Sequence, residues 1–144
     1  MKSILLVFSF LMLLSCSVTK EEKVLKKIYI KEFKYRYFAS CVKNGFDNSK
    51  EVQTLFEVDN SGYGEPILGD KYLLIDSIAK ITAKKIKLDS VNSIGKIAEG
   101  VQGKKVFSTC LCEYNSNWLD SIAKNEYKKN LKLDRDFKRV LNKN

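Results

Sequence analysis

Helix-breaking residues are scarce in this chain, which has one Pro and seven Gly among its 144 residues. Such a composition argues against collagen-like, linker-rich and many-turned all-β architectures. Hydrophobic residues make up 44% of the chain, which is enough to build a core and too many for a disordered protein. We therefore expect an all-α fold, and the length suits one ordinary domain.

Apolar residues recur at helical spacing along most of the chain and predict a single compact domain of about five helices. The first helix ends at Gly45, and a short second helix begins near Asp47 or Ser49, either of which could cap it. Residues 33–37 also alternate as a strand would, but the surrounding run is long and free of Gly and Pro, which favours a helix. The first helix is expected to bury Leu25, Ile28, Phe33, Tyr37, Phe38, Cys41 and Val42.

The middle of the chain predicts one long helix and one loop. Residues 59–64 form a turn, and the third helix is expected to begin at Glu65 and Pro66 and to reach Ile86. Residues 88–105 contain three Gly together with Ser, Asn and Asp, so they predict a loop with at most one helical turn.

The C-terminal part predicts two further helices and a tail. Residues 106–114 form the fourth helix, and Ser116 caps a last helix that begins at Asn117. Trp118, Leu119, Ile122, Ala123 and Tyr127 are expected on its inner face. Residues 128–144 carry five Lys and two Arg, and they predict a basic tail with one more helical stretch.

The N-terminus resembles the leader of a bacterial lipoprotein. Lys2 is followed by an apolar run, Ile4–Leu14, and then by a small residue and Cys16. Because a membrane-spanning helix needs about 20 apolar residues, this run has the size of a signal-peptide core instead. We expect residues 1–15 to be the lipoprotein signal peptide and Cys16 to be lipidated. A secretory signal cut elsewhere and an uncut anchor are the alternatives.

A lipidated chain would lie in the cell envelope, with residues 16–27 as the tether and the domain facing the periplasm. In that oxidising compartment, Cys41, Cys110 and Cys112 predict one disulfide and one spare thiol. Cys110 and Cys112 would point to nearly opposite sides of a helix, so only one of them can easily face Cys41. A metal site is not expected, because these three thiolates lack a natural fourth ligand.

The chain contains no His, which excludes Ser-His-Asp and Cys-His catalysis and the common zinc motifs. Its paired carboxylates lie in charged stretches that are expected to be solvated, and Gly62-Tyr63-Gly64 is a turn rather than a nucleotide loop. We therefore expect a binding protein and not an enzyme, with no cofactor and no metal.

The formal net charge is +9, from 26 Lys+Arg against 17 Asp+Glu. Such a charge can serve nucleic-acid binding, but the expected envelope location argues against that partner. Anionic lipid headgroups, cell-wall polymers and acidic protein surfaces are the favoured partners, and most lysines are expected on solvated helix faces.

The segment from Cys110 to Ala123 resembles a motif near the C-terminus of the type VI secretion amidase immunity proteins of the fourth group. The matching positions are Cys110, Leu111, Tyr114, Asn115, Ser116, Leu119, Ile122 and Ala123. Two upstream patches occur in the same order as in that family. They are an aromatic helix end, Tyr37-Phe38-Ala39-Ser40-Cys41, and a helix entry, Tyr63-Gly64-Glu65-Pro66-Ile67. The resemblance covers about Phe33 to Tyr127, and we expect residues 28–127 to form a helical immunity-protein-like domain.

The resemblance implies a small all-α homodimeric inhibitor in the periplasm. Its partner would be a peptidoglycan amidase of the NlpC/P60 cysteine-peptidase kind, and its role would be to protect the producing cell. It also implies a disulfide between the first and the penultimate helix, which corresponds to Cys41 and Cys110, with Cys112 left as the spare thiol.

An inhibitor of this kind is expected to fill a cleft with a protruding loop and a helix face. We expect Leu88–Gly103 and the exposed side of the third helix to make this contact. The effector-binding candidates are Asp89, Ser90, Asn92, Ser93, Lys96, Glu99 and Gln102. The alternative is a structural or adaptor envelope lipoprotein that binds cell wall or a membrane complex.

Overall fold

The computed structural model describes the backbone of residues 2–62 and 67–141 and the side chains of residues 22–61, 67–99 and 101–131. Within these ranges the chain is helical and has no strand, which confirms an all-α domain of five helices. The helices are α1 (Lys2–Gly45), α2 (Lys50–Val58), α3 (Lys71–Ser93), α4 (Val106–Tyr114) and α5 (Asn117–Leu141). Two 3₁₀ turns, η1 (Asn60–Gly62) and η2 (Glu99–Val101), lie in the connections.

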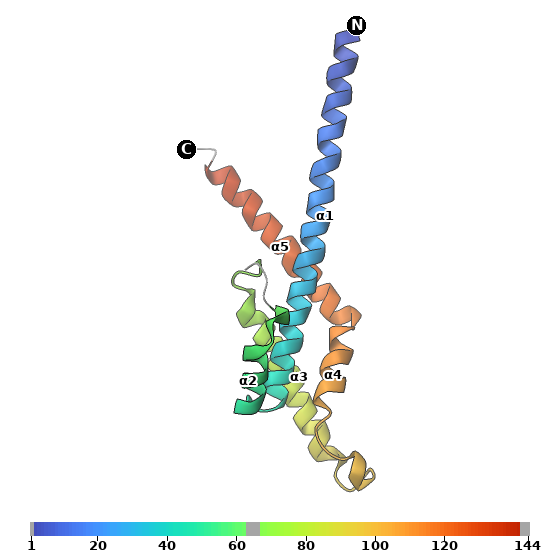
Figure 1. Cartoon of the computed structure of the whole chain (residues 1–144), viewed down its shortest axis with the longest axis vertical. Helices are drawn as coiled ribbons and strands as arrows, with labels where there is room; N and C mark the ends of the chain where they lie inside the picture. The colour runs from blue at the N-terminus through green and yellow to red at the C-terminus, as the bar shows by residue number, and fades with distance from the viewer. Residues whose placement is uncertain (1, 63–66, 142–144) are drawn as a thin grey trace.

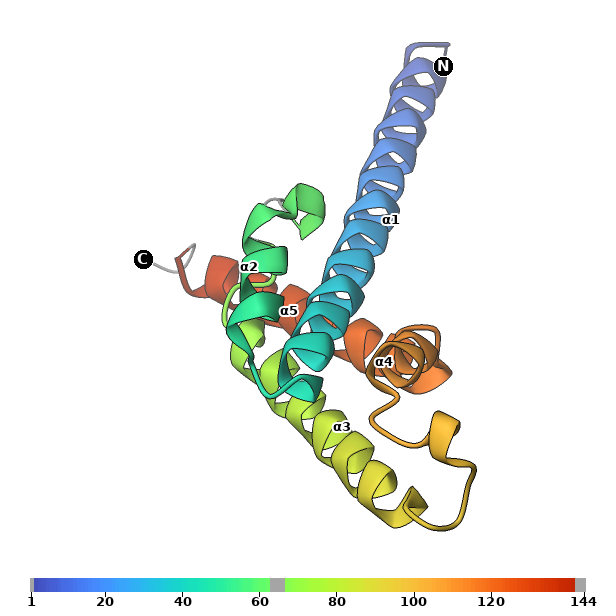
Figure 2. The same ribbon diagram turned by 60° about the horizontal axis from the view of Figure 1, so that its bottom comes forward.

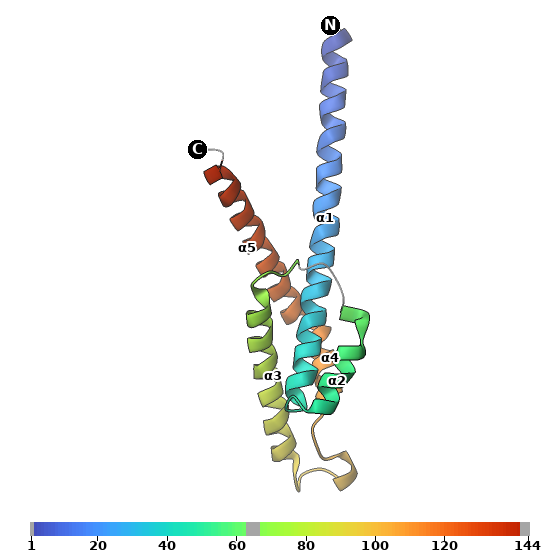
Figure 3. The ribbon, with the colours of Figure 1, turned by 60° about the vertical axis from the view of Figure 1, so that its left-hand side comes forward.

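The helices are arranged around α1, because α3, α4 and α5 all pack against it. Figure 1 and Figure 3 show α3 running down beside α1, a turn at the bottom, and α4 and α5 returning upward. The N-terminal part of α1 and the C-terminal part of α5 project beyond the other helices at the same end. Figure 2 brings the opposite end, where α3 connects to α4, toward the viewer.

The core is centred on a row of α1 side chains. Tyr29, Phe33, Tyr37 and Cys41 recur every four residues, so they lie on one face of the helix, and each is at most 3% exposed. The other helices contribute Ile75, Ala79 and Ile86 from α3, Val106 and Cys110 from α4, and Leu119, Ala123 and Tyr127 from α5. Among the α1 side chains that the structure describes, from residue 22 on, Tyr29 is the first that is buried. The expected burial of Leu25 and Ile28 is therefore wrong: both are about half exposed.

Trp118 departs in part from the expected inner face of α5. It is 46% exposed, although its ring meets the edge of the Tyr37 ring at 6.1 Å between centroids. The polar groups of the core are paired. The Tyr37 hydroxyl lies 2.7 Å from Thr82 Oγ1, and Glu126, only 6% exposed, forms ion pairs with Lys71 and Lys129.

A disulfide joins Cys41 of α1 to Cys110 of α4, with 5.8 Å between their Cα atoms. Both cysteines are fully buried, whereas Cys112 is exposed and free. This result confirms the expected pairing and the spare thiol. Because 69 residues separate the two cysteines, the bond closes a long loop that contains α2 and α3.

The third helix is displaced toward the C-terminus relative to its prediction. It begins at Lys71, after Gly69 adopts φ +54°, a left-handed conformation that interrupts a helix; Glu65 and Pro66 lie outside the described residues. The helix also continues past Ile86 to Ser93, so a loop over 88–93 was a wrong prediction. No Gly or Pro occurs in α3, and Gly95 with φ +72° is the first residue that redirects the chain.

Two helix boundaries show how local residues act. Ser116 caps α5 as expected, because its Oγ accepts a hydrogen bond of 3.1 Å from the Leu119 N–H. Gly45 ends α1, but the left-handed cap residues are Asp47 and Asn48, with φ +55° and +54°. A Cβ on Gly45 would lie 2.6 Å from Val106 Cγ1, so its glycine permits close packing of α1 against α4.

The expected tether and tail are parts of longer helices. Residues 16–27 belong to α1, and residues 128–141 continue α5 without a break instead of forming a separate stretch. Neither segment contains Gly or Pro, and Lys, Glu and Leu propagate a helix well. Within the described residues, no helix combines the length and apolar character that crossing a membrane requires.

Candidate functional site at the distal end of the bundle

The distal end, residues 86–109, comprises the last two turns of α3, the connection to α4 and the first turn of α4. It lies at the bottom of Figure 1, opposite the projecting ends of α1 and α5. The connection is ordered by its own hydrogen bonds: the Lys96 N–H donates to the Ser93 carbonyl at 3.0 Å, and Gln102 Nε2 donates to the Ile97 carbonyl at 3.1 Å. Lys104 then binds both the Gly45 carbonyl, at 3.2 Å, and the Asp47 carboxylate.

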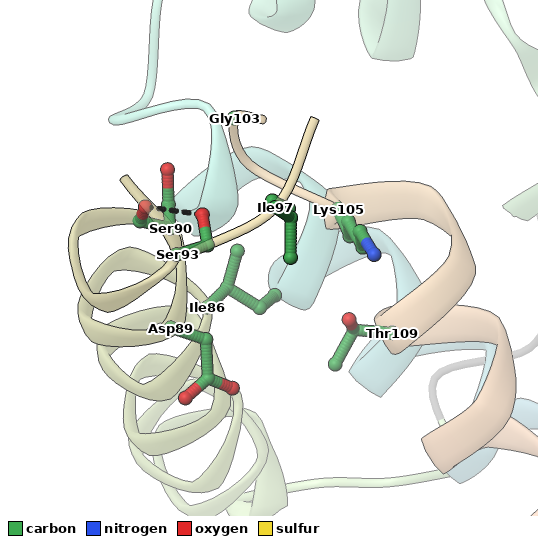
Figure 4. A pocket seen from close by; sticks show the side chains of 8 residues that line it. All are labelled: Ile86, Asp89, Ser90, Ser93, Ile97, Gly103, Lys105 and Thr109. Atoms are coloured by element: carbon green, nitrogen blue, oxygen red, sulfur yellow. Dashed lines mark hydrogen bonds between the residues drawn. The ribbon is translucent and has the colours of Figure 1, made fainter. Parts of the chain in front are cut away.

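A cavity of about 230 Å³ lies between α3, the connection and α4. Figure 4 shows the side chains around it: Ile86, Asp89, Ser90, Ser93, Ile97, Gly103, Lys105 and Thr109. The Ser93 hydroxyl is already committed, because it donates to the Ser90 carbonyl at 2.7 Å. The cavity therefore offers one carboxylate, one ammonium group and hydroxyls beside two isoleucines, a mixture that suits a polar side chain of a partner protein.

The seven effector-binding candidates fall into two groups. Asp89, Ser90 and Ser93 line the cavity from α3. The other four do not line it, and they are Asn92 on α3 and Lys96, Glu99 and Gln102 in the connection. Gln102 is half-buried and holds the connection in shape, whereas Asn92, Lys96 and Glu99 are exposed.

The distal end exposes a group of apolar side chains, and the sequence pattern did not predict them as contact residues. Five hydrophobic side chains of the distal end are exposed, and Ile97 among them also lines the cavity: Leu88 (54% exposed), Val91 (60%), Ile94 (65%), Ile97 (38%) and Val101 (54%). The sequence does contain a sign of this apolar group, because its first four residues recur at every third position. A contiguous group of exposed apolar residues on a small protein marks an interaction site.

The outer face of α3 continues this apolar group. Leu73, 81% exposed, and Ile81, 70% exposed, lie within 80° of Leu88 and Val91 around an ideal helix. The buried residues Ile75 and Ala79 point to the opposite side, so α3 has two apolar faces and only one of them is covered. This arrangement agrees with the expectation that the exposed side of the third helix is a contact surface.

The electrostatics of the distal end also stabilise its shape. Lys104 lowers the pKa of the Asp47 carboxyl, first through the hydrogen bond between them and then through its charge, and Lys87 adds a smaller effect. The ion pair therefore joins the connection before α4 to the turn between α1 and α2 at neutral pH. It holds the connection in place beside the cavity.

The expected lipid attachment site cannot be placed in the same way. Cys16, the expected lipid attachment site, lies in α1 outside the residues whose side chains are described. Among those side chains, no group of three or more His, Cys, Asp or Glu residues is arranged to hold a metal ion. The sequence matches no protein-family model, and neither a curated protein nor a solved structure is significantly similar to it.

Proposed function

We propose that this protein is an immunity protein that binds and inhibits a type VI secretion peptidoglycan amidase of the NlpC/P60 kind in the periplasm. The observation that carries the proposal is the Cys41–Cys110 disulfide. The resemblance to the fourth group of amidase immunity proteins requires a bond between the first and the penultimate helix. The disulfide joins α1 to α4, the penultimate of the five helices.

Five of the residues that carry the resemblance stabilise the corner between α4 and α5. Cys110, Leu119 and Ala123 are fully buried, and Ser116 caps α5. Tyr114 meets the edge of the Phe38 ring at 6.1 Å between centroids. The motif is therefore mainly a scaffold, although Leu111, 52% exposed, and Asn115 face solvent, and we assign the selection of a particular amidase to residues outside it.

The distal end is the surface that we assign to this selection. Its exposed apolar residues lie in the last turns of α3 and in the connection at one end of the bundle, a position that suits insertion into an active-site cleft. Asp89 and Lys105 in the adjoining cavity can then form polar contacts that fix the orientation of the complex. Inhibition of this kind blocks access to the catalytic cysteine and needs no catalytic group on the inhibitor.

The test is a titration of the full chain, kept in nonionic detergent, against the amidase encoded beside its gene, while cleavage of peptidoglycan stems is followed. We expect stoichiometric loss of cleavage at nanomolar concentrations. The variant Ile94→Ser/Ile97→Ser should weaken inhibition by about 100-fold or more, since each buried interface anchor contributes roughly 2 kcal/mol. The matched control is Leu55→Ser/Val58→Ser on α2, which removes two exposed apolar side chains, 64% and 72% exposed, away from the distal end.

Undiminished cleavage at micromolar excess of the full chain would contradict the proposal. It would favour the alternative, a structural or adaptor lipoprotein that binds cell wall or a membrane complex. Lipidation at Cys16 and homodimerisation are parts of the proposal with separate readouts. Mass spectrometry of the membrane fraction tests the first, and sedimentation of the detergent-solubilised chain tests the second.

A further inference from the structure

The net charge of the chain is concentrated at one end of the molecule. Residues 32–127, which include most of the bundle, contain thirteen basic and thirteen acidic residues. Residues 20–31 contain five Lys and two Glu, and residues 128–144 contain five Lys and two Arg against two Asp. These two segments, here called the basic arms, therefore supply eight of the nine net positive charges.

The fold brings the basic arms to the same end. Residues 20–31 lie in α1, and residues 128–141 lie in α5, the two helices that project together beyond the bundle. The arms approach each other where the Tyr127 hydroxyl donates to the Glu22 carbonyl at 3.3 Å. The distal end lies at the far end of the molecule from them.

The charges of the arm in α1 are available, in contrast to many in the bundle and to Lys129 of the arm in α5, which forms an ion pair with Glu126. Lys23, Lys27 and Lys31 are exposed, Lys26 is half-buried, and none of these four forms an ion pair with another described side chain. In residues 32–127, by contrast, five cations pair with acidic residues. These pairs are Arg36–Glu32, Lys71–Glu126, Lys80–Asp76, Lys104–Asp47 and Lys124–Asp120.

The arm in α1 also exposes apolar side chains. Val24, Leu25 and Ile28 are 52%, 47% and 49% exposed. On an ideal helix they fall within an arc of about 100°, and Lys27 and Lys31 lie beside that arc. An apolar stripe flanked by lysines is the pattern of a helix that lies at the boundary between lipid headgroups and acyl chains.

We propose that the basic arms form a docking surface for an anionic phospholipid bilayer, so that the distal end points away from the membrane. Charge complementarity selects an anionic partner, and the apolar stripe selects a bilayer over a soluble polyanion. The inference does not rest on amidase inhibition, because a chain that fails to inhibit could still dock in this way.

The test measures partition of the full chain onto sedimenting vesicles. One set is pure phosphatidylcholine, and the other is an equimolar mixture with phosphatidylglycerol. The ratio of the two partition coefficients isolates the anionic contribution, because the uncharged apolar run binds both sets. We expect a ratio far above one that falls as salt is added.

Two variants that remove the same charge locate the surface. Lys23→Gln/Lys26→Gln/Lys27→Gln/Lys31→Gln removes four charges from the arm, and we expect it to lower the ratio by roughly 600-fold, at roughly fivefold for each lysine. The control Lys80→Gln/Lys84→Gln/Lys85→Gln/Lys87→Gln removes four exposed charges from α3 and should change the ratio by less than about threefold. Circular dichroism checks that both variants fold.

A second pair of variants tests the apolar stripe. Val24→Ser/Leu25→Ser/Ile28→Ser should weaken partition onto both vesicle types, whereas Leu73→Ser/Ile81→Ser/Val91→Ser on α3 should not. Equal losses in the two lysine variants would overturn the proposal, because total charge would then govern binding. A wild-type ratio near one would overturn it as well. Displacement from the mixed vesicles by inorganic polyphosphate at equal phosphate concentration would replace the membrane with a soluble polyanion as the partner.

Discussion

Removal of the Cys41–Cys110 disulfide should destabilise the fold strongly, and the structure sets the size of the effect. The bond closes a loop of about 70 residues, since its cysteines are 69 positions apart. In the chain-entropy description, a loop of this length contributes about 4 kcal/mol by restricting the unfolded chain. For a domain of this size, that loss lowers the melting temperature on the order of 10–15 °C.

The assay is thermal unfolding of Cys41→Ala/Cys110→Ala, followed by circular dichroism. Its matched control is Cys112→Ala, which removes an exposed thiol close to the disulfide and should change the melting temperature by less than about 2 °C. A reducing agent should destabilise the wild type and leave the double variant unchanged. A loss below about 1 kcal/mol on removing the disulfide, or an equal loss in the Cys112 variant, would refute the reasoning.

Further substitutions test the close packing, one hydrogen bond and one buried titratable group of the core. Gly45→Ala should cost about 1–3 kcal/mol, because its Cβ would overlap Val106, and adding Val106→Ala should cost less than the two separate effects predict in a double-mutant cycle of melting curves. Tyr37→Phe should cost about 1–3 kcal/mol in urea unfolding, because it leaves the Thr82 hydroxyl without its partner. Burial, with smaller effects from nearby carboxylates, raises the pKa of Tyr29 to about 12. The resulting stability is present below pH 10 and is lost as the pH rises through 12, so the wild type should lose up to about 3 kcal/mol that Tyr29→Phe does not lose.

Much of the fold could be predicted from the sequence because helical periodicity is a local property. The end of α1 at Gly45, the bounds of α4 and the start of α5 after Ser116 all follow from residues within one turn of the boundary. The start of α3 could not be placed in this way. Leu68 is fully buried although it precedes the helix, so an apolar residue that continues the helical pattern can serve the core from a turn.

The candidate site was harder to predict because its residues differ in secondary structure and exposure from what their local pattern indicates. Polar residues over 88–103 predicted a contact loop, yet Asp89, Ser90 and Ser93 lie on α3, where they line a cavity. Exposed apolar residues such as Ile94 were not selected by the sequence pattern, and the fold shows that nothing in the described chain covers them. Exposure depends on contacts between distant segments, and a local pattern does not contain those contacts.

The charge distribution distinguishes the two ends of the molecule. Lysines occur along the whole chain, and their composition alone predicts that they lie on solvated surface. This prediction suits residues 32–127, where positive and negative charges balance. The imbalance becomes meaningful only when the fold places residues 20–31 and 128–141 at one end and the apolar residues of the distal end at the other. A protein that docks to a membrane through its basic arms would hold the distal end away from that surface, where a soluble partner in the envelope can reach it. The two surfaces can therefore be disabled separately: the lysine variant of α1 should keep its affinity for the amidase in detergent, and the Ile94 and Ile97 variant should keep its affinity for anionic vesicles.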